Sequence, residues 1–559
     1  MAIDNVSPEC SASTFAQLET VMVDYFPRWE TSKYGFRQRG YWQMVMLSAL
    51  PTDRRGPRTE ARLEEWGRKF HGEEIHPPSG IKARWVGSPI GAAAIPRMSD
   101  AHWLSALERY KTDVNSCRRR HGFLEGGAHQ LSGVLESEVK RDPLRFAQLS
   151  KQFPADTHRY YYRALLRGLK DSSADKDTVL TVVRRVFALP DKPGHRYVCD
   201  VIDKFNDEDL PEDILAIVAW CATESKDPND DELTVQTSGS EEDNTPHDIL
   251  TTAINSIRGA AAETVGTLLF NRADRVPFFV PYLERMVQDP TVIVRTTVAN
   301  SLFCFYKHDE SHAVHLFLTL VDTDNDHLLA TYPVDRFLHY ANVRHFHRLR
   351  PVLRRMLDSP VPAVRETGAR HVCLAQFNNL DAADMVAECV AGDEAQRKGA
   401  ARVAKANLFN PECATFTHDK LPIFFNDPTK VIRDEAAGCF HNSEGRDLEK
   451  VKPIIRAFLG SNAFDENVED IVWPLTRSTA DLAEEILLTC EAVIAHMESL
   501  DDNPVHRLHG QANNVAQLLL RAYRQTNDTA VRTRILDIID RLLGQEVYGI
   551  SKELDEFER

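Results

Sequence analysis

A short pattern recurs along the second half of the chain and constrains its fold more than any other feature of the sequence. Its copies share an arginine followed closely by small residues, and they are centred on Arg258, Arg295, Arg365, Arg397 and Arg433. The period is about 35 residues, with one degenerate copy near Leu329. Repeats of this length are typical of a solenoid, in which each unit buries its apolar face only against its neighbours.

The fullest copies show which helix of the repeat the pattern marks. In one of them Pro290 is followed by Val294, Arg295 and Ala299, and two other copies keep this spacing. Proline is tolerated in the first turn of a helix, where its missing N–H would be unpaired, and the preceding Asp289 can cap the helix. The pattern is typical of the second helix of a HEAT repeat. We therefore predict an all-α, HEAT-like solenoid.

The five repeat arginines have two readings, structural and ligand-binding. In HEAT proteins the equivalent arginine typically reaches an acidic residue of a neighbouring repeat, so the resemblance favours a structural role for all five. Valine and alanine beside each arginine face inward in this interpretation, because small residues let neighbouring helices approach closely.

Hydrophobic periodicity and helix breakers divide the rest of the chain. Five tryptophans cluster near the N-terminus and predict a separate packing unit there: Trp29, Trp42, Trp66, Trp85 and Trp103. Proline and glycine predict a long loop over residues 76–98. The predicted divisions are an irregular N-terminal helical segment (1–98), helical hairpins (99–222), an acidic flexible linker (223–246), HEAT-like repeats (247–462) and capping helices (463–559).

The predicted linker reads TESKDPNDDELTVQTSGSEEDNTP and contains no aromatic residue. Such a segment buries too little apolar surface to offset the entropy lost on ordering. A solvated connection is the simpler interpretation, and an acidic functional tract is the alternative.

Composition excludes several classes of protein. No stretch approaches the roughly 20 uninterrupted apolar residues of a membrane span, and the N-terminus lacks the order of a secretory signal, so we expect a cytoplasmic protein without membrane contact. The net charge of -16 argues against generic nucleic-acid binding. The ten cysteines are scattered without a CxxC pair, which indicates reduced core residues.

Several segments resemble the C-terminal helical-repeat region of large bacterial STAND (NACHT-type) NTPases, many of them antiviral defence proteins. The resemblance extends over residues 99–559 and rests on SDAHWLSALERY, GGAHQLSGVLESEVKRDPLRFAQLS, LPEDILAIVAWCATE, INSIRGAAAETVGTLLF and TRILDIIDRLLGQEVYGISKELDEFER. In that family the array senses a foreign protein or holds an autoinhibited state. This chain lacks the GxxxxGK[ST] loop that cradles phosphates, so we expect either a fragment or a stand-alone recognition array.

One basic cluster in this acidic chain is the candidate partner-binding surface. It contains Arg344, His345, His347, Arg348, Arg350, Arg354 and Arg355. The cluster either contacts an acidic partner or forms a solvated helical face paired with nearby Asp and Glu. A smaller basic run, Arg118 to His121, is typical of a helix end. The histidines at 312, 315, 339, 345 and 347 match no zinc-ligand spacing.

No sequence motif supports catalysis. The chain contains neither GxSxG nor a cysteine in a convincing nucleophile setting, so we expect a non-enzyme without cofactor or metal. The leading hypothesis is a protein-recognition or sensor module, in bacterial antiphage defence, that binds a protein ligand or a partner subunit such as a separate NTPase or effector. The alternatives are a structural scaffold of a multiprotein complex and a HEAT-like DNA-binding enzyme.

Overall fold

The computed structural model is helical throughout, apart from one very small sheet, and confirms the predicted all-α, HEAT-like solenoid. It describes residues 3, 7–27, 30, 39–70, 86–112, 119–120, 123–154, 156–190, 192–228, 246–378, 380–441, 443–445, 447–499 and 504–544. The chain forms two compact units. Unit 1 comprises residues 1–89 and 114–126, and unit 2 comprises residues 90–113 and 127–559.

The described residues of unit 1 include three helices, α2 (Ala12–Asp24), α3 (Tyr41–Ser48) and α4 (Pro57–Lys69). Trp66 of α4 donates its indole N–H to Oε1 of the buried Gln43 at 2.6 Å. Gly40 begins α3 with φ of 93°, and a Cβ there would lie 2.6 Å from the Trp66 ring. Sequence periodicity gives little sign of α4 because only Thr59 and Trp66 of its residues are buried.

The sheet of unit 1 lies partly in the segment that was predicted to be a loop. Strand β1 (Val86–Gly87) pairs in parallel with β3 (Phe123–Glu125), and β2 (Arg119–Arg120) pairs with β3 in the antiparallel sense. Residues 76–85 of the predicted loop lie outside the described residues, and the η3 turn (Ile95–Arg97) follows β1. Local composition did not reveal β1 because its partner strand lies far along the chain.

The first part of unit 2 is a series of packed helices: α5 (Asp100–Arg109), α6 (Ala128–Arg141), α7 (Pro143–Leu149), α8 (Arg159–Lys170), α9 (Lys176–Ala188), α10 (His195–Asp203) and α11 (Glu212–Thr223). Trp103 is fully buried on α5, and its ring centroid lies 5.6 Å from that of Phe146 on α7. Assigning Trp103 to the N-terminal aromatic unit was therefore wrong. Its position on the apolar face of α5 places it in the core of unit 2.

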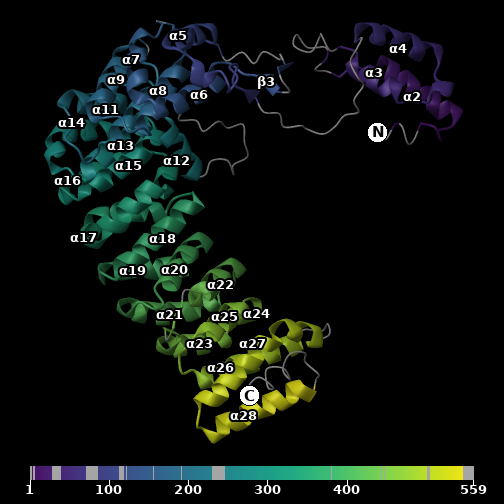
Figure 1. The fold of residues 1–559 in the computed structure, drawn as a ribbon. Helices are drawn as coiled ribbons and strands as arrows, with labels where there is room; N and C mark the ends of the chain where they lie inside the picture. The colour runs from purple at the N-terminus through teal and green to yellow at the C-terminus, as the bar shows by residue number, and fades with distance from the viewer. Residues whose placement is uncertain are drawn as a thin grey trace. The chain divides into compact units, whose positions relative to one another are not determined.

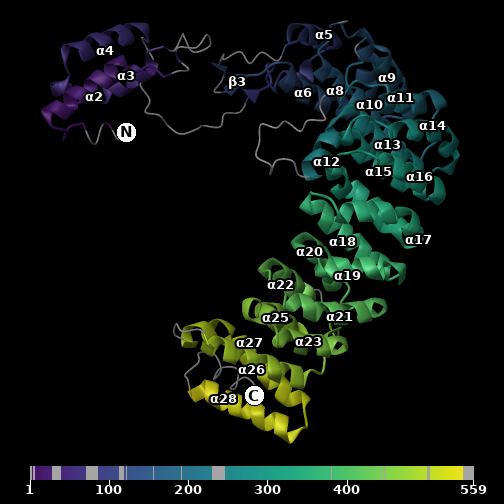
Figure 2. The same ribbon diagram turned by 180° about the vertical axis from the view of Figure 1, so that it is seen from behind.

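The repeats continue as helix pairs: α12 (Pro246–Asn255), α13 (Ile257–Phe270), α14 (Val276–Met286), α15 (Val292–Tyr306), α16 (Glu310–Leu320), α17 (Tyr332–Leu357), α18 (Pro362–Gln376), α19 (Ala383–Ala391), α20 (Glu394–Ala406), α21 (Ala414–Phe425) and α22 (Lys430–Ala437). Figures 1 and 2 show two layers, with α18, α20 and α22 on one side of α19 and α21. Each repeat arginine lies in the first turn or two of a second helix. One continuous core of buried side chains extends from Ile95 to Leu542.

In the degenerate repeat, the second helix runs directly into the first helix of the following repeat, and together they form α17. The segment that begins at Tyr332 occupies the place of a second helix, with Pro333 in its first turn. It continues through a kink at His345, whose φ of −122° and ψ of 23° are not helical. In the preceding repeat, residues 307–309 separate α15 from α16. The kink therefore replaces an interhelical loop.

The C-terminal part contains α23 (Lys452–Leu459), α24 (Asn462–Glu466), α25 (Glu469–Arg477), α26 (Ala483–Ser499), α27 (Pro504–Gln525) and α28 (Thr529–Gly544). Helix α25 ends before α26 begins because Ser478 takes an extended conformation with ψ of 140°. None of the helices within the described residues combines the length and apolarity needed to cross a membrane.

Candidate functional site

Two repeat arginines each form a buried ion pair with an aspartate of the following repeat. That aspartate lies just before the second helix of its repeat. Nε of Arg258 lies 2.8 Å from Oδ2 of Asp289, and both side chains are only 7% exposed. Nε of Arg397 lies 2.7 Å from Oδ2 of Asp427, which is 3% exposed. Asp289 also accepts hydrogen bonds from the backbone N–H and hydroxyl of Thr291. These contacts join consecutive repeats through buried, charge-assisted hydrogen bonds.

The other three repeat arginines also bind within the array. Nε of Arg365 lies 2.6 Å from Asp393, and Nη2 of Arg433 lies 2.8 Å from Glu466. Arg295 instead donates to three backbone carbonyls, those of Asp289, Leu320 and Asp322. Burial lowers the pKa of Arg295, although nearby aspartates oppose that shift. All five guanidinium groups thus contact neighbouring helices or loops of the solenoid.

The predicted basic cluster lies on α17 and is divided among several neighbours. Arg344 and His345 both contact Glu310, at 2.7 and 3.3 Å, and Arg348 donates to the Ser311 carbonyl. On the side of the next repeat, His347 lies 3.6 Å from Asp381, and Arg354 lies 2.6 Å from Glu388.

The two remaining members of the cluster differ. Arg355 lies 2.7 Å from Asp326, whereas Arg350 is exposed and has no ion-pair partner among the described residues. Most of the charges in this cluster already lie close to a carboxylate of the chain itself. Contact between the cluster and an acidic partner stays a prediction.

The other sequence candidates contribute no metal site in the described part of the chain. His312 lies 3.7 Å from Glu284, and no group of three or more His, Cys, Asp or Glu side chains there is placed to hold an ion. Arg119 and Arg120 form strand β2 rather than a helix end, while Arg118 and His121 lie outside the described residues.

A second basic surface, not predicted from the sequence, lies where α8, α10, α11, α12 and α13 meet. It consists of two adjoining hollows of about 530 and 480 Å³, which share Lys192, His195 and Ile257 in their walls. We call it the basic groove and define it by Arg159, Arg163, Lys192, His195 and Arg196. Figure 2 labels α8, α10, α11, α12 and α13 in the same region of unit 2.

Aromatic rings position the cations of the basic groove. The guanidinium carbon of Arg163 lies 5.3 Å from the centre of the Tyr197 ring, and that of Arg159 lies 5.6 Å from the Tyr160 ring. Nζ of Lys192 lies 4.0 Å from the Phe187 ring centre. Cation–π contacts of this kind hold a charge in place without neutralising it.

Arg159, Arg163, Lys192 and Arg196 have no ion-pair partner among the described residues, although Glu224 and Asp227 line the second hollow. Among the described residues, no carboxylate lies within 4.0 Å of Arg159, Arg163, Lys192 or Arg196, and Arg196 donates instead to the neutral amide oxygen of Asn255 at 2.8 Å. Burial, together with the charge of Lys192, lowers the pKa of His195 to about 4, so its imidazole is neutral at pH 7. The first hollow, whose wall carries these four cations and no carboxylate, is suited to binding an anion.

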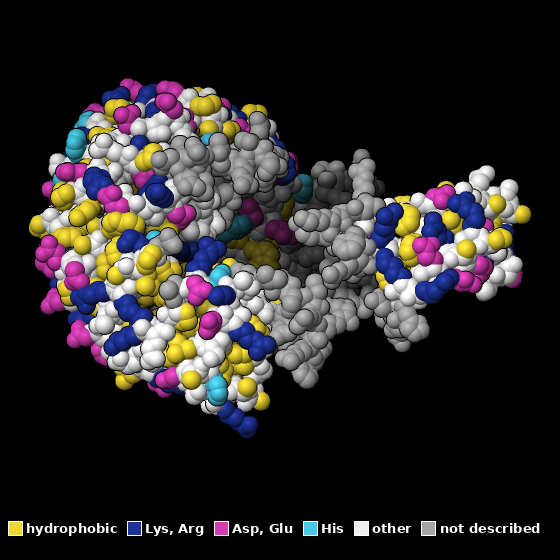
Figure 3. All heavy atoms as spheres, turned by 90° about the horizontal axis from the view of Figure 1, so that it is seen from above, with side chains coloured by type: hydrophobic (Ala, Val, Ile, Leu, Met, Phe, Trp, Pro, Cys, Tyr) yellow, Lys and Arg dark blue, Asp and Glu magenta, His cyan; other side chains and the backbone are white. Residues whose placement is uncertain are grey.

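Elsewhere on unit 2 the charges are mixed. Figure 3 shows Lys and Arg interspersed with Asp and Glu over the visible face of the larger body. No field of one sign covers this face.

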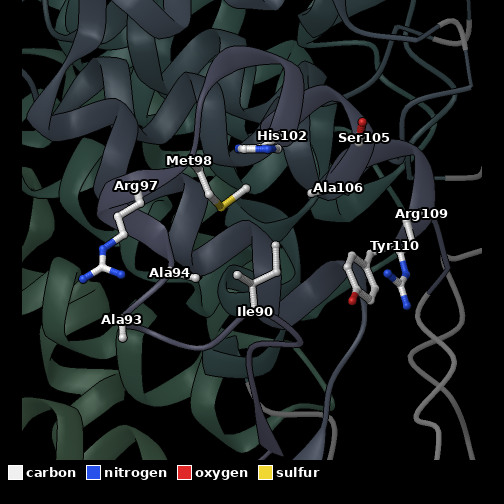
Figure 4. Close-up of a pocket in the computed structure, with 10 residues that line it drawn as sticks. All are labelled: Ile90, Ala93, Ala94, Arg97, Met98, His102, Ser105, Ala106, Arg109 and Tyr110. Atoms are coloured by element: carbon white, nitrogen blue, oxygen red, sulfur yellow. The ribbon is translucent and has the colours of Figure 1, made fainter.

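A further cavity of about 600 Å³ lies between η3 and α5. Figure 4 shows Ile90, Met98 and Tyr110 around this hollow, with Arg97 and Arg109 near its two ends. Its walls are largely apolar, and it contains no comparable group of cations.

Sequence reasoning missed the basic groove because its residues come from four separate segments between Arg159 and Ile257. The one local signal is the run Lys-Pro-Gly-His-Arg at residues 192–196, which combines a turn, a helix start and three basic side chains.

No family model matches the chain, and no curated protein sequence matches it. Among solved structures, the karyopherin Kap121p bound to the SUMO protease Ulp1p is similar with 12% identity and a TM-score of 0.40, over 100% of this chain and 57% of that chain. The structure of the Pds5–Scc1 complex is similar with 10% identity and a TM-score of 0.28, over 97% of this chain and 81% of that chain. This chain thus spans little more than half the length of the karyopherin, and the comparisons identify no family for it.

Proposed function

We propose that this chain is a non-catalytic recognition array that binds an acidic segment of a partner protein in the basic groove. The observation that carries the proposal is the uncompensated charge of Arg159, Arg163, Lys192 and Arg196 in a chain of net charge -16. Cations that gather in a hollow without ion-pair partners favour an anionic ligand, because complementary charges across an interface attract.

A protein partner is favoured over a nucleic acid. Binding to a phosphate backbone requires an extended basic surface that displaces many counterions, whereas the cations of the basic groove lie in one hollow and the face in Figure 3 carries both signs of charge. The groove is large enough for a short peptide segment, and the solenoid offers further contact area beside it.

The test compares three versions of the full chain as bait in affinity purification. The groove variant carries Arg159→Glu, Arg163→Glu and Arg196→Glu, and the matched control carries Arg58→Glu, Arg68→Glu and Arg477→Glu at exposed arginines elsewhere. Both variants change the net charge equally. We expect the wild type and the control to retain a partner that the groove variant loses at least tenfold, with binding that weakens as salt rises. Equal recovery by all three proteins would contradict the proposal.

The resemblance to STAND NTPase repeats supports a finer proposal, that the array recognises a protein ligand in bacterial antiphage defence. Purification from phage-infected and uninfected cells separates this role from that of a structural scaffold. A sensor retains a phage-dependent partner, whereas a scaffold retains the same host subunits in both.

The cluster on α17 is tested in the same assay by charge reversal at Arg348 and Arg354. Unchanged partner binding and unchanged salt dependence would remove that surface from consideration.

A further inference from the structure

The start of α10 places several unused hydrogen-bond donors in the basic groove. Gly194 precedes the helix with φ of 81° and provides no side-chain cap. The backbone N–H groups of His195 and Arg196 are therefore left without a partner, as is usual in the first turn of a helix, and no acceptor for them lies among the described residues. The positive end of the helix dipole adds to the charge of the nearby side chains.

Two buried side-chain nitrogens at the same place are also without partners. Nε2 of His195 and Nε of Arg196 are inaccessible to solvent and make no hydrogen bond in the structure. Buried polar atoms are nearly always satisfied in folded proteins. Together with the backbone N–H groups, they show that the start of α10 carries polar groups that the described residues leave unsatisfied.

The aromatic rings of the groove are occupied by its own cations. Tyr197 lies under both Arg163 and Arg196, and the Trp220 ring lies 4.9 Å from Nζ of Lys192. Ring faces covered in this way do not offer stacking platforms to a nucleotide base. The ligand is therefore recognised by charge and hydrogen bonds.

We infer that the basic groove binds a phosphate monoester carried by the partner protein, with the phosphate at the start of α10. This inference rests on the proposed function and specifies the chemistry of the bound segment. A phosphate monoester brings nearly two negative charges and three acceptor oxygens, which suits several guanidinium groups and a helix N-terminus together. A carboxylate has one charge and two oxygens and leaves part of this donor set unused.

The experiment uses the purified full chain and three probes at fixed ionic strength. They are an N-acetylated, C-amidated Gly-phosphoserine-Gly tripeptide, its Gly-Glu-Gly counterpart, and AMP. Isothermal titration calorimetry measures the affinities, with inorganic sulfate as a competitor. We expect the phosphopeptide to bind at least tenfold more tightly than either the glutamate peptide or AMP.

Two single variants locate the site. Arg196→Gln removes the charge beside Asn255 and is expected to weaken phosphopeptide binding at least tenfold, whereas Arg477→Gln, on the exposed surface of α25, leaves it unchanged. Circular dichroism checks that both variants unfold at the wild-type temperature to within a few degrees.

Each result has a distinct meaning. Equal binding of the two peptides, both weakened by Arg196→Gln, overturns the phosphate inference while the acidic-segment proposal stands. Tighter binding of AMP overturns the assignment of the phosphate to a protein. Absence of binding by all three probes, together with partner capture by the groove variant, overturns both the inference and the proposed function.

Discussion

At the residue scale, the arginine–carboxylate ion pairs of the solenoid differ sharply in burial. Arg258 and Asp289 are each 7% exposed, whereas Arg354 and Glu388 are 42% and 44% exposed. Removing one member of a buried pair leaves an uncompensated charge in a poorly solvated place, while exposed pairs contribute little.

We therefore expect Arg258→Met to lower the free energy of unfolding by about 3 to 5 kcal/mol. Arg354→Met, its exposed counterpart, should lower it by less than about 1 kcal/mol. Urea denaturation followed by circular dichroism measures both. Similar losses in the two variants would show that burial does not set the strength of these pairs.

His195 gives the fold a dependence on acid. Its pKa is about 4 in the folded chain and 6.5 in a solvated reference, so between these values the unfolded chain binds more protons. Stability is therefore lost as the pH falls from 6.5 toward 4. We expect His195→Gln to show a smaller decrease in melting temperature between pH 7 and pH 4.5 than the wild type. An equal decrease in both proteins would contradict the assigned protonation.

At the element scale, α17 shows how a repeat loses its loop. His345 interrupts the helical conformation between two segments that correspond to separate helices in other repeats. At this kink the chain passes from one helix of the solenoid to the next. Residues added there therefore leave the buried faces of both helices close to their original positions. Interior positions of the second helices have no such freedom.

We expect a Gly-Ser insertion after His345 to lower the free energy of unfolding by about 1 kcal/mol, as loop extensions do. The same insertion after Ala299 in α15 rotates the following residues by about 200° and turns the fully buried Leu302 out of the core. It should cost several kcal/mol, on the order of one large core side chain lost. Thermal unfolding of the two insertion variants provides the comparison.

At the scale of the whole molecule, each helix pair covers the apolar face of the one before it. Helix α27 packs on α26 and contributes buried Val515, Leu518 and Leu519 to the shared core. Helix α28 adds a smaller set, Ile535, Ile539 and Leu542.

We expect a chain ending after residue 499 to aggregate, because it exposes the face of α26 that includes Leu487 and Val493. A chain ending after residue 527 keeps α27 and should remain monodisperse with a lower melting temperature. Size-exclusion chromatography with light scattering distinguishes them. Aggregation of neither chain would mean that α27 is not needed to cover the core.

The sequence by itself determined the fold class and the phase of the repeats. The position of Pro290 and the three-and-four spacing of apolar residues act within a few turns of one helix, so they are readable locally. It also indicated α5 to α11, whose apolar faces are regular. It failed at β1, which pairs with a distant strand.

Only the tertiary structure decided which charges are available for binding. The sequence left open whether the cluster on α17 is paired, because Glu310, Asp326 and Glu388 lie about one repeat away in sequence, and stacking brings them within contact distance. The basic groove was invisible for the converse reason, since residues from Arg159 to Ile257 meet only when α8, α10 and α13 pack together. Periodicity fixes which face of a helix is buried, but charge pairing depends on which helices become neighbours.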